Sequence, residues 1–347
     1  MKARTPAGVA PGRRRTLAAL PLCVLAPATL AASAAPEVLR EARPLMGTRV
    51  GIIVQAPGRG EEARPAVAAA FGEMQRLEAM MTRYAAGNAL KRLEQHAGGA
   101  PQRLPRELFA VLQAAAAAAL ASEGAFDITV GAYSGWHFEA GAKRRIPAAA
   151  ELAAQRALVG HRDLELDARE GLARLRRQGM RLDLGGIAKL PILEAGHAVL
   201  ARHGLADALI DGGGDIRASG RLQGRAWRVG LRDPLEPARL LGTVEIDATG
   251  GWVASSGDYE RMFVADGRRY HHILDPKTGE PTRGPRGVSL LGRELGELNG
   301  LGVALMVGGR DAAERWLSAR PGVQALLVQP DGSRWSTPGF DSRLRRG

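Results

Sequence analysis

Cysteine and aromatic residues are scarce in this chain of 347 residues, which contains one cysteine and only 4% Phe, Trp and Tyr. The cysteine, Cys23, lies in an N-terminal segment that we expect to be removed, which excludes disulfides, a thiol nucleophile and Cys-ligated zinc from the remainder. The low aromatic content argues against a base-stacking surface for nucleic acid. A charged fraction of 24% excludes a polytopic membrane protein, and apolar runs along the whole chain exclude a disordered tail protein.

Positive charge exceeds negative charge, with 48 Lys and Arg against 36 Asp and Glu. Five positive charges and no acidic residue fall in residues 1–34, so the net charge of +12 leaves +7 for the rest of the chain. Nearly all of this remainder is arginine. These arginines are either scattered over a solvated surface or serve to attract an anionic ligand. Because no dense basic cluster with interleaved aromatics occurs, we expect no nucleic-acid partner.

The N-terminus has the pattern of an export signal. Arg13-Arg14-Arg15 precedes a short apolar stretch from Leu17 to Ala32, and Ala32-Ser33-Ala34 forms an A-x-A cleavage site. We expect removal of residues 1–34 and a periplasmic protein that meets the membrane only through this signal. Arg14-Arg15 also fits a loose twin-arginine signal, so the export route stays open. We expect residues 35–347 to form a single domain.

Helical and strand patterns mix along the remainder without a regular βαβ alternation. Apolar residues recur at helical spacing from Glu61 to Tyr84, and further helices are predicted after Pro105, over 188–203 and near 298–307. We therefore predict an α+β fold of mixed or antiparallel sheets with packed helices. Strands are predicted over 49–55, 180–184, 208–211, 227–231, 243–246, 253–255, 260–264, 269–274, 287–291 and 323–328.

Two glycine clusters follow predicted strands. Gly185-Gly186 opens a helix, so its backbone N–H groups can hold phosphate oxygens while Lys189 adds a positive charge. The second cluster is Gly212-Gly213-Gly214, and neither cluster is a Walker A loop or a dinucleotide fingerprint. Taken alone, each cluster is better explained by a tight turn that needs positive φ.

The most informative polar stretch runs from Tyr270 to Gly279. Strand alternation sends His271 and His272 to opposite faces, so they do not chelate one metal together. We expect one histidine to face a pocket and the other to make a structural hydrogen bond. His272 is the candidate general base or phosphate ligand, and Asp275 either orients His272 or caps the following turn.

Seven motifs in order resemble the ApbE family of FAD:protein FMN transferases, and together they cover most of the chain after the signal. They are Met46-Gly47-Thr48, Met81-Thr82-Arg83-Tyr84, Phe126 to Gly131, Leu182 to Lys189, Gly213 to Arg217, Ser256 to Arg261 and Tyr270 to Pro276. The resemblance implies an ApbE-like fold and transfer of FMN from FAD to a Thr or Ser hydroxyl of an exported protein. AMP is released, with help from a divalent cation, usually Mg²⁺.

The resemblance also assigns roles to individual residues. Met46 and Tyr84 contact the flavin nucleotide, Asp127 hydrogen-bonds to it, Lys189 reaches FAD, and His272 is the catalytic or phosphate-contacting imidazole. Asp275 is the second catalytic candidate. The carbonyl of Gly186 and the side chain of Asn299 are the expected metal ligands. The expected partner is a flavin-acceptor protein of a redox complex.

The metal segment departs from the family pattern. Asn299 stands where the family has Asp, and Val303 stands where it has Thr, with both expected on one helix face. Val offers no oxygen, so we expect a weak Mg²⁺ site. Two alternatives to the transferase therefore stay open. One is a periplasmic flavin-binding or assembly protein that has lost the chemistry, and the other is an FAD hydrolase that gives FMN and AMP.

Overall fold

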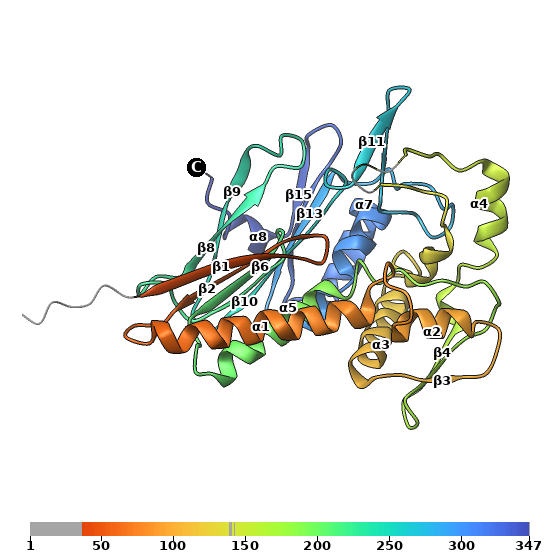
Figure 1. The fold of residues 1–347 in the computed structure, drawn as a ribbon. Coiled ribbons are helices and arrows are strands. Elements are labelled where there is room, and N and C mark those ends of the chain that lie inside the picture. The colour runs from red at the N-terminus through yellow and green to blue at the C-terminus, as the bar shows by residue number, and fades with distance from the viewer. Residues whose placement is uncertain (1–36, 139–140, 142, 347) are drawn as a thin grey trace, which may run out of the picture. The chain divides into compact units, whose positions relative to one another are not determined.

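Eight strands form the central sheet of the computed structural model, which describes residues 37–138, 141 and 143–346 (Figure 1). The predicted export signal, residues 1–34, lies outside the described residues, so the division at residue 34 stays a prediction. Every neighbouring pair in this sheet is antiparallel. In sheet order the strands are β1 (Val38–Leu45), β2 (Thr48–Gln55), β6 (Ala208–Gly212), β7 (Ile216–Ser219), β10 (Gly251–Gly257), β13 (Gly287–Gly292), β14 (Gln324–Val328) and β15 (Arg334–Ser336).

One face of the sheet carries the main hydrophobic core. Successive side chains of a strand point to opposite faces, and Val50, Ile52 and Val54 of β2 are buried on this one. Gly196 on the helix over 189–202 has no side chain, so Met74 on the helix over 60–81 packs directly against the backbone there. The helices over this face are α1 (Gly60–Met81), α5 (Lys189–Arg202) and α7 (Leu301–Ser318).

The opposite face of the sheet is covered as well. Trp227 and Phe340 pack there with Val253 and Leu326, which point away from the helical face. The sheet is therefore buried on both sides, and its combination with packed helices confirms the predicted α+β class. The covering elements are the hairpin of β8 (Trp227–Arg232) and β9 (Leu240–Ile246) and the short helix α8 (Pro338–Asp341).

Smaller elements surround this framework. A third apolar cluster includes Tyr133, Trp136, Phe263 and Tyr270. It packs the hairpin of β11 (Met262–Ala265) and β12 (Arg268–His271) against the loop before α4 (Ala149–Arg156). The hairpin turns at Asp266-Gly267, as the sequence predicts, and both residues have positive φ. The remaining elements are α2 (Ala89–Gln95), β3 (Gln102–Arg103), α3 (Arg106–Ala121), the 3₁₀ helices η1 (Ile128–Ala132) and η2 (His161–Asp163), β4 (Leu164–Asp167), β5 (Leu172–Leu175) and α6 (Leu295–Leu298).

Three expectations about local structure need correction. Residues 180–184 are not a strand, although Met180, Leu182 and Leu184 are buried in alternation, because this extended segment has no neighbouring strand to pair with. The helix predicted to reach Tyr84 ends at Met81. The helix predicted near 298–307 is interrupted at Gly300, which has φ +79°. Among the described residues, no helix has the length and apolar character needed to cross a membrane.

Candidate active site

Lys189 and Asp215 form the first contact of the candidate site. The Nζ atom of Lys189, at the start of α5, lies 2.9 Å from Oδ2 of Asp215 in the loop between β6 and β7. The other carboxylate oxygen, Oδ1, accepts a hydrogen bond of 2.9 Å from the backbone N–H of Ser255 on β10. Asp215 therefore ties the lysine predicted to reach FAD to the end of the central sheet.

The glycine loop beside Asp215 approaches the turn between β1 and β2. Gly213 has φ +75°, and a Cβ at this position would lie 2.4 Å from Oγ1 of Thr48, so only glycine fits. Within the β1–β2 turn, Met46 itself has φ +53°, an uncommon value for a residue with a side chain. Its N–H donates a 2.7 Å hydrogen bond to Oε1 of Glu78 on α1, which holds this conformation. The predicted flavin contact Met46 thus lies next to the loop that carries Asp215.

Asp183 is an acidic residue of the site that sequence reasoning placed in a motif but gave no role. Its Oδ2 lies 2.5 Å from Nη1 of Arg83, and its Oδ1 accepts a 2.9 Å hydrogen bond from the N–H of Gly185. Burial acts to raise the pKa of Asp183, but the Arg83 guanidinium and the Gly185 N–H outweigh it and lower that pKa. Asp183 is therefore an anion at neutral pH. The signal available in the sequence was an acidic residue directly before a glycine pair that opens a helix.

His272 is bonded to Arg261 through the backbone and is influenced by the charge of Asp183. Its backbone N–H donates to the carbonyl of Arg261 over 3.2 Å, and its Nδ1 is buried with no hydrogen-bond partner among the described residues. Burial, together with the positive charge of Arg261, lowers the pKa of His272 to about 4, against an opposing effect of Asp183. His272 is therefore neutral at pH 7, and its ring has a nitrogen free to accept or donate a proton.

His271 has the structural role that we expected for one of the two histidines. It is buried, and its Nε2 donates a 2.9 Å hydrogen bond to the carbonyl of Thr282. The hydroxyl of Thr282 in turn donates to the carbonyl of Met306 on α7 over 2.9 Å. These two bonds fasten the histidine segment to the helix that carries Val303.

Asp275 caps the turn that follows the histidines. Its Oδ1 accepts a 2.8 Å hydrogen bond from the N–H of Lys277, and no hydrogen bond joins Asp275 to His272 among the described residues. The turn is also held by Tyr133, whose hydroxyl donates to the carbonyl of Pro276 over 2.9 Å. The capping alternative is the one that the structure contains, and no contact supports the orienting role.

Asp127 is buried, and both of its carboxylate oxygens are engaged within the protein. Oδ1 accepts from the N–H and the hydroxyl of Thr129 at 2.8 and 2.6 Å, and Oδ2 accepts from the N–H of His161 at 2.8 Å. Asp127 therefore caps the 3₁₀ helix η1 and fixes the adjacent loop. Its predicted hydrogen bond to the flavin nucleotide stays a prediction.

Tyr84 is exposed over 66% of its surface, just beyond the end of α1. The guanidinium carbon of the neighbouring Arg83 lies 5.9 Å from the centroid of its ring. A large exposed aromatic ring beside a site suits stacking on a planar ligand. Arg83 thus links the predicted flavin contact Tyr84 to Asp183.

The expected metal ligands offer few oxygens to Mg²⁺. Gly186 and Val303 do meet, because Cγ2 of Val303 lies 3.0 Å from the position that a Cβ would take on Gly186, but Val303 presents a methyl group. Asn299 is buried, and its Oδ1 has no hydrogen-bond partner in the described part of the chain, so one neutral oxygen is available. Asn299 ends α6 in an extended conformation and so does not share a helix face with Val303, contrary to expectation.

The surrounding acidic residues that the structure describes do not form a metal cluster either. Within the described part of the chain, no group of three or more His, Cys, Asp or Glu side chains is placed to hold a metal ion. Mg²⁺ prefers carboxylate and water oxygens in octahedral geometry. One amide oxygen and one backbone carbonyl, Asn299 and Gly186, are a poor fit for Mg²⁺.

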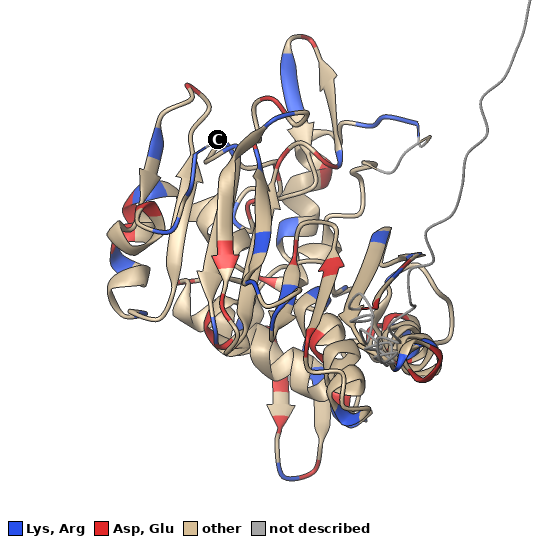
Figure 2. Cartoon of the chain, turned by 90° about the vertical axis from the view of Figure 1, so that its left-hand side faces the viewer, with Lys and Arg blue, Asp and Glu red and all other residues tan. Residues whose placement is uncertain are grey.

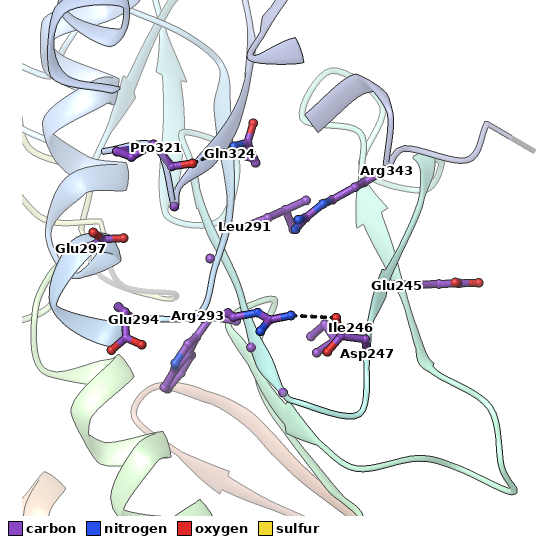
Figure 3. A pocket seen from close by; sticks show the side chains of 15 residues that line it. Glu245, Ile246, Asp247, Leu291, Arg293, Glu294, Glu297, Pro321, Gln324 and Arg343 are labelled. Atoms are coloured by element: carbon purple, nitrogen blue, oxygen red, sulfur yellow. Dashed lines mark hydrogen bonds and ion pairs between the residues drawn. The ribbon is translucent and has the colours of Figure 1, made fainter. Parts of the chain in front are cut away.

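A pocket of about 450 Å³ lies elsewhere, at the other end of β10 from Ser255 (Figure 3). Trp252 and Leu291 contribute to its wall, and the 2.9 Å ion pair of Arg293 with Asp247 lies at its edge. Its charged lining is mostly acidic, which does not suit an anionic dinucleotide. The charged residues that line it are Glu245, Asp247, Glu294, Glu297, Arg293 and Arg343.

The structure joins three of the predicted site residues, Lys189, Met46 and His272, through a chain of contacts. Lys189 meets Asp215, whose loop meets the Met46 turn, and this turn approaches Arg261 and hence His272. Positive and negative residues are interspersed over the elements that face the viewer in Figure 2, so the site is not part of a uniformly basic face in this view. The site is therefore defined by particular pairings rather than by overall charge.

Comparison with known proteins agrees with the ordered motifs. The model of the ApbE family matches residues 46–327. The FAD:protein FMN transferase of Treponema pallidum (strain Nichols) is 31% identical over 320 residues, and the alignment covers 87% of each chain. The FAD:protein FMN transferase of Salmonella typhimurium is 26% identical over 336 residues, with 93% of each chain covered.

Solved structures agree with the fold. The ApbE protein of Thermotoga maritima has a TM-score of 0.81 and 28% identity, covering 89% of this chain and 100% of its own. The flavin transferase ApbE from Vibrio cholerae has a TM-score of 0.76 and 26% identity, with the same coverage of 89% and 100%. The family model, the relatives and the shared fold show that this chain belongs to the ApbE family.

Proposed function

We propose that this member of the ApbE family transfers FMN from FAD to a Thr or Ser hydroxyl of an exported protein. The hydroxyl oxygen forms a bond to the phosphorus of the FMN half, the pyrophosphate P–O bond breaks, and AMP leaves with the electron pair. The proton of the hydroxyl passes to a base on the enzyme. The observation that carries the proposal is Asp183, which accepts a hydrogen bond from Gly185 of the glycine pair before Lys189 and whose negative charge also acts on the neutral His272.

His272 is our candidate for the base. Its Nδ1 is buried with no hydrogen-bond partner among residues that the structure describes, and its pKa, lowered to about 4 by burial and by Arg261, keeps the ring neutral. Asp183 contributes a negative charge that stabilises the imidazolium formed when the ring takes the proton. Asp275 holds the turn after His272 and thereby positions the segment.

The other residues bind FAD. Tyr84 stacks on the isoalloxazine, Met46 contacts it, and Asp127 holds the adjacent loop or bonds to the nucleotide. Lys189, at the N-terminal end of α5, supplies positive charge to the diphosphate together with the backbone N–H groups of the glycine corner. Binding these groups orients the bond that breaks toward His272.

Mg²⁺ enters the proposal only as the ion that family resemblance implies. It would neutralise charge on the phosphates, but the donor set of Gly186 and Asn299 does not fit it. The acceptor hydroxyl, the release of AMP and the periplasmic location are likewise proposals that need direct tests.

The direct test incubates the purified chain with FAD, Mg²⁺ and a flavin-acceptor domain that carries a Thr or Ser acceptor. We expect a mass increase on the acceptor equal to one FMN and an equimolar release of AMP. The matched control is the acceptor domain with its Thr or Ser replaced by Ala, which stays unmodified. FAD binding without a mass shift or AMP release would contradict the transferase proposal.

A second candidate is a flavin-binding or assembly protein without transfer chemistry. The observation that favours it is the methyl group of Val303 against Gly186, at a place where the resemblance implies a metal ligand. The same incubation separates the two functions, because this candidate binds FAD and leaves it intact.

A further inference from the structure

Arg261 lies at the junction of two predicted parts of the site. The β11–β12 register pairs Met262 with His271, so Arg261 stands directly opposite His272, and its carbonyl accepts the N–H of His272. Residues opposite each other in an antiparallel pair lie about 5 Å apart between Cβ atoms. Arg261 and His272 are therefore fixed neighbours.

The guanidinium of Arg261 reaches the turn between β1 and β2. Its Nη2 lies 3.3 Å from the position that a Cβ would take on Gly47, so the absence of a side chain at Gly47 makes room for it. This turn also holds Met46, the predicted flavin contact. Arg261 thus lies between the residue expected at the flavin and the residue expected at the reacting phosphate.

The charge of Arg261 has no carboxylate partner in the described part of the chain, and its side chain is exposed. The two other cations discussed above are each paired, Lys189 with Asp215 at 2.9 Å and Arg83 with Asp183 at 2.5 Å. An unpaired guanidinium presents five N–H donors in a planar fork that fits two phosphate oxygens at once.

We propose that Arg261 binds the diphosphate of FAD through its guanidinium and so holds the reacting phosphate beside His272. This inference rests on the proposed function and adds a binding residue to it. It assigns to Arg261 the cationic role that Lys189 fills only in part, because Asp215 offsets the charge of Lys189.

The test measures binding of FAD and of riboflavin to the full chain and to Arg261→Ala, by quenching of flavin fluorescence. Riboflavin shares the ring system but has no phosphate. We expect Arg261→Ala to weaken FAD binding about ten- to a hundredfold and to leave riboflavin binding unchanged. Arg261→Lys should restore part of the FAD affinity, since lysine keeps the charge but lacks the fork.

The matched control is Arg169→Ala, which removes another exposed arginine, located in the turn between β4 and β5, with no ion pair in the described residues. An equal loss of FAD affinity in Arg169→Ala would show a general charge effect and overturn the inference. Equal losses for FAD and riboflavin in Arg261→Ala, or unchanged FAD affinity, would overturn it as well. If the unmodified chain binds no FAD, the proposed function fails together with the inference. Circular dichroism checks that each variant is folded.

Discussion

Val303 and Gly186 touch across the candidate site, with Cγ2 of Val303 3.0 Å from the position of a Cβ on Gly186. This contact joins α7 to the corner that opens α5. It places a methyl group, rather than an oxygen, beside Gly186, the residue whose carbonyl is expected to bind a metal. The buried Oδ1 of Asn299 has no hydrogen-bond partner among the described residues, so Asn299 and the carbonyl of Gly186 offer two oxygens where a metal site needs several.

Replacing both residues should create a metal site. We expect Asn299→Asp with Val303→Thr to bind Mn²⁺ at least tenfold more tightly than the unmodified chain, because a carboxylate and a hydroxyl are added to the donor set. Titration calorimetry or the EPR signal of free Mn²⁺ measures this without reference to activity. Val303→Thr alone is the control, since it adds no charge. Equal Mn²⁺ affinity in all three proteins would contradict the interpretation.

His272→Ala should slow FMN transfer by about a hundredfold or more, because general base catalysis contributes about this much. Its affinity for FAD should change by less than about threefold, since the imidazole takes a proton and carries no charge at pH 7. Single-turnover rates and FAD titrations separate the two effects. An affinity loss that accounts for the whole defect would make His272 a binding residue only.

Removing the carboxylate of Asp215 tests its two contacts. Asp215→Ala leaves the N–H of Ser255 without its acceptor and Lys189 without its partner, and Asp215 is buried. We expect a loss of about 1–3 kcal/mol in the free energy of unfolding. Asp215→Asn keeps an acceptor for the N–H of Ser255, so its free energy of unfolding should fall less than that of Asp215→Ala. Urea denaturation of both variants measures the difference, and an Asn variant as unstable as the Ala variant would assign the effect to the ion pair.

Gly279→Ala should destabilise the turn after the histidines. Gly279 has φ +74°, and a Cβ would lie 2.4 Å from the ring of Tyr133, so alanine adds both backbone strain and a clash. Gly267→Ala is the matched control, because Gly267 has φ +72° with nothing within 4 Å. Thermal unfolding should show that Gly279→Ala loses about 1–3 kcal/mol more of the free energy of unfolding than Gly267→Ala does. Equal losses would mean that the Tyr133 contact contributes nothing.

Protonation of His197 should lower stability in acid. Burial, and the charge of Arg217, lower the pKa of His197 to about 4, below the ordinary value of 6.5. The unfolded chain therefore binds this proton more readily, so the stabilisation is complete above pH 6.5 and is lost as the pH falls through 4.

His197→Gln removes this titration. Between pH 7 and pH 4 the unmodified chain should lose up to about 3 kcal/mol more stability than the variant. Urea midpoints at several pH values measure the two profiles, and glutamine can still bond to the hydroxyl of Ser219, which lies 2.9 Å from Nε2 of His197. Parallel profiles would contradict the assignment.

The fold class was predictable because its signals are local. Helical spacing in α1 and strand alternation in β2 reflect burial on one side, which periodicity reports directly. The edge strand β1 gave no such signal, since only Leu45 of it is buried and its sequence is rich in charge. The alternation of residues 180–184 predicted a strand that does not form, because alternating burial also occurs in an extended segment between packed elements.

The pairings within the site were not predictable. The ion pair of Arg83 and Asp183 joins residues 100 positions apart, and sequence spacing carries no information about such a contact. Motif order located Lys189 and His272 but not the charges that accompany them. The break at Gly300 was missed because a glycine inside an apolar pattern is tolerated in many helices, and only the fold shows its positive φ.

Thr282 gives the histidine segment a mechanical link to α7. Its carbonyl receives the hydrogen bond of His271, and its hydroxyl holds the carbonyl of Met306. A sideways shift of this helix would therefore be transmitted to His272 through two bonds, without passing through any ligand. Substitutions on the buried side of α7 can therefore change the catalytic rate although every residue that touches FAD stays the same.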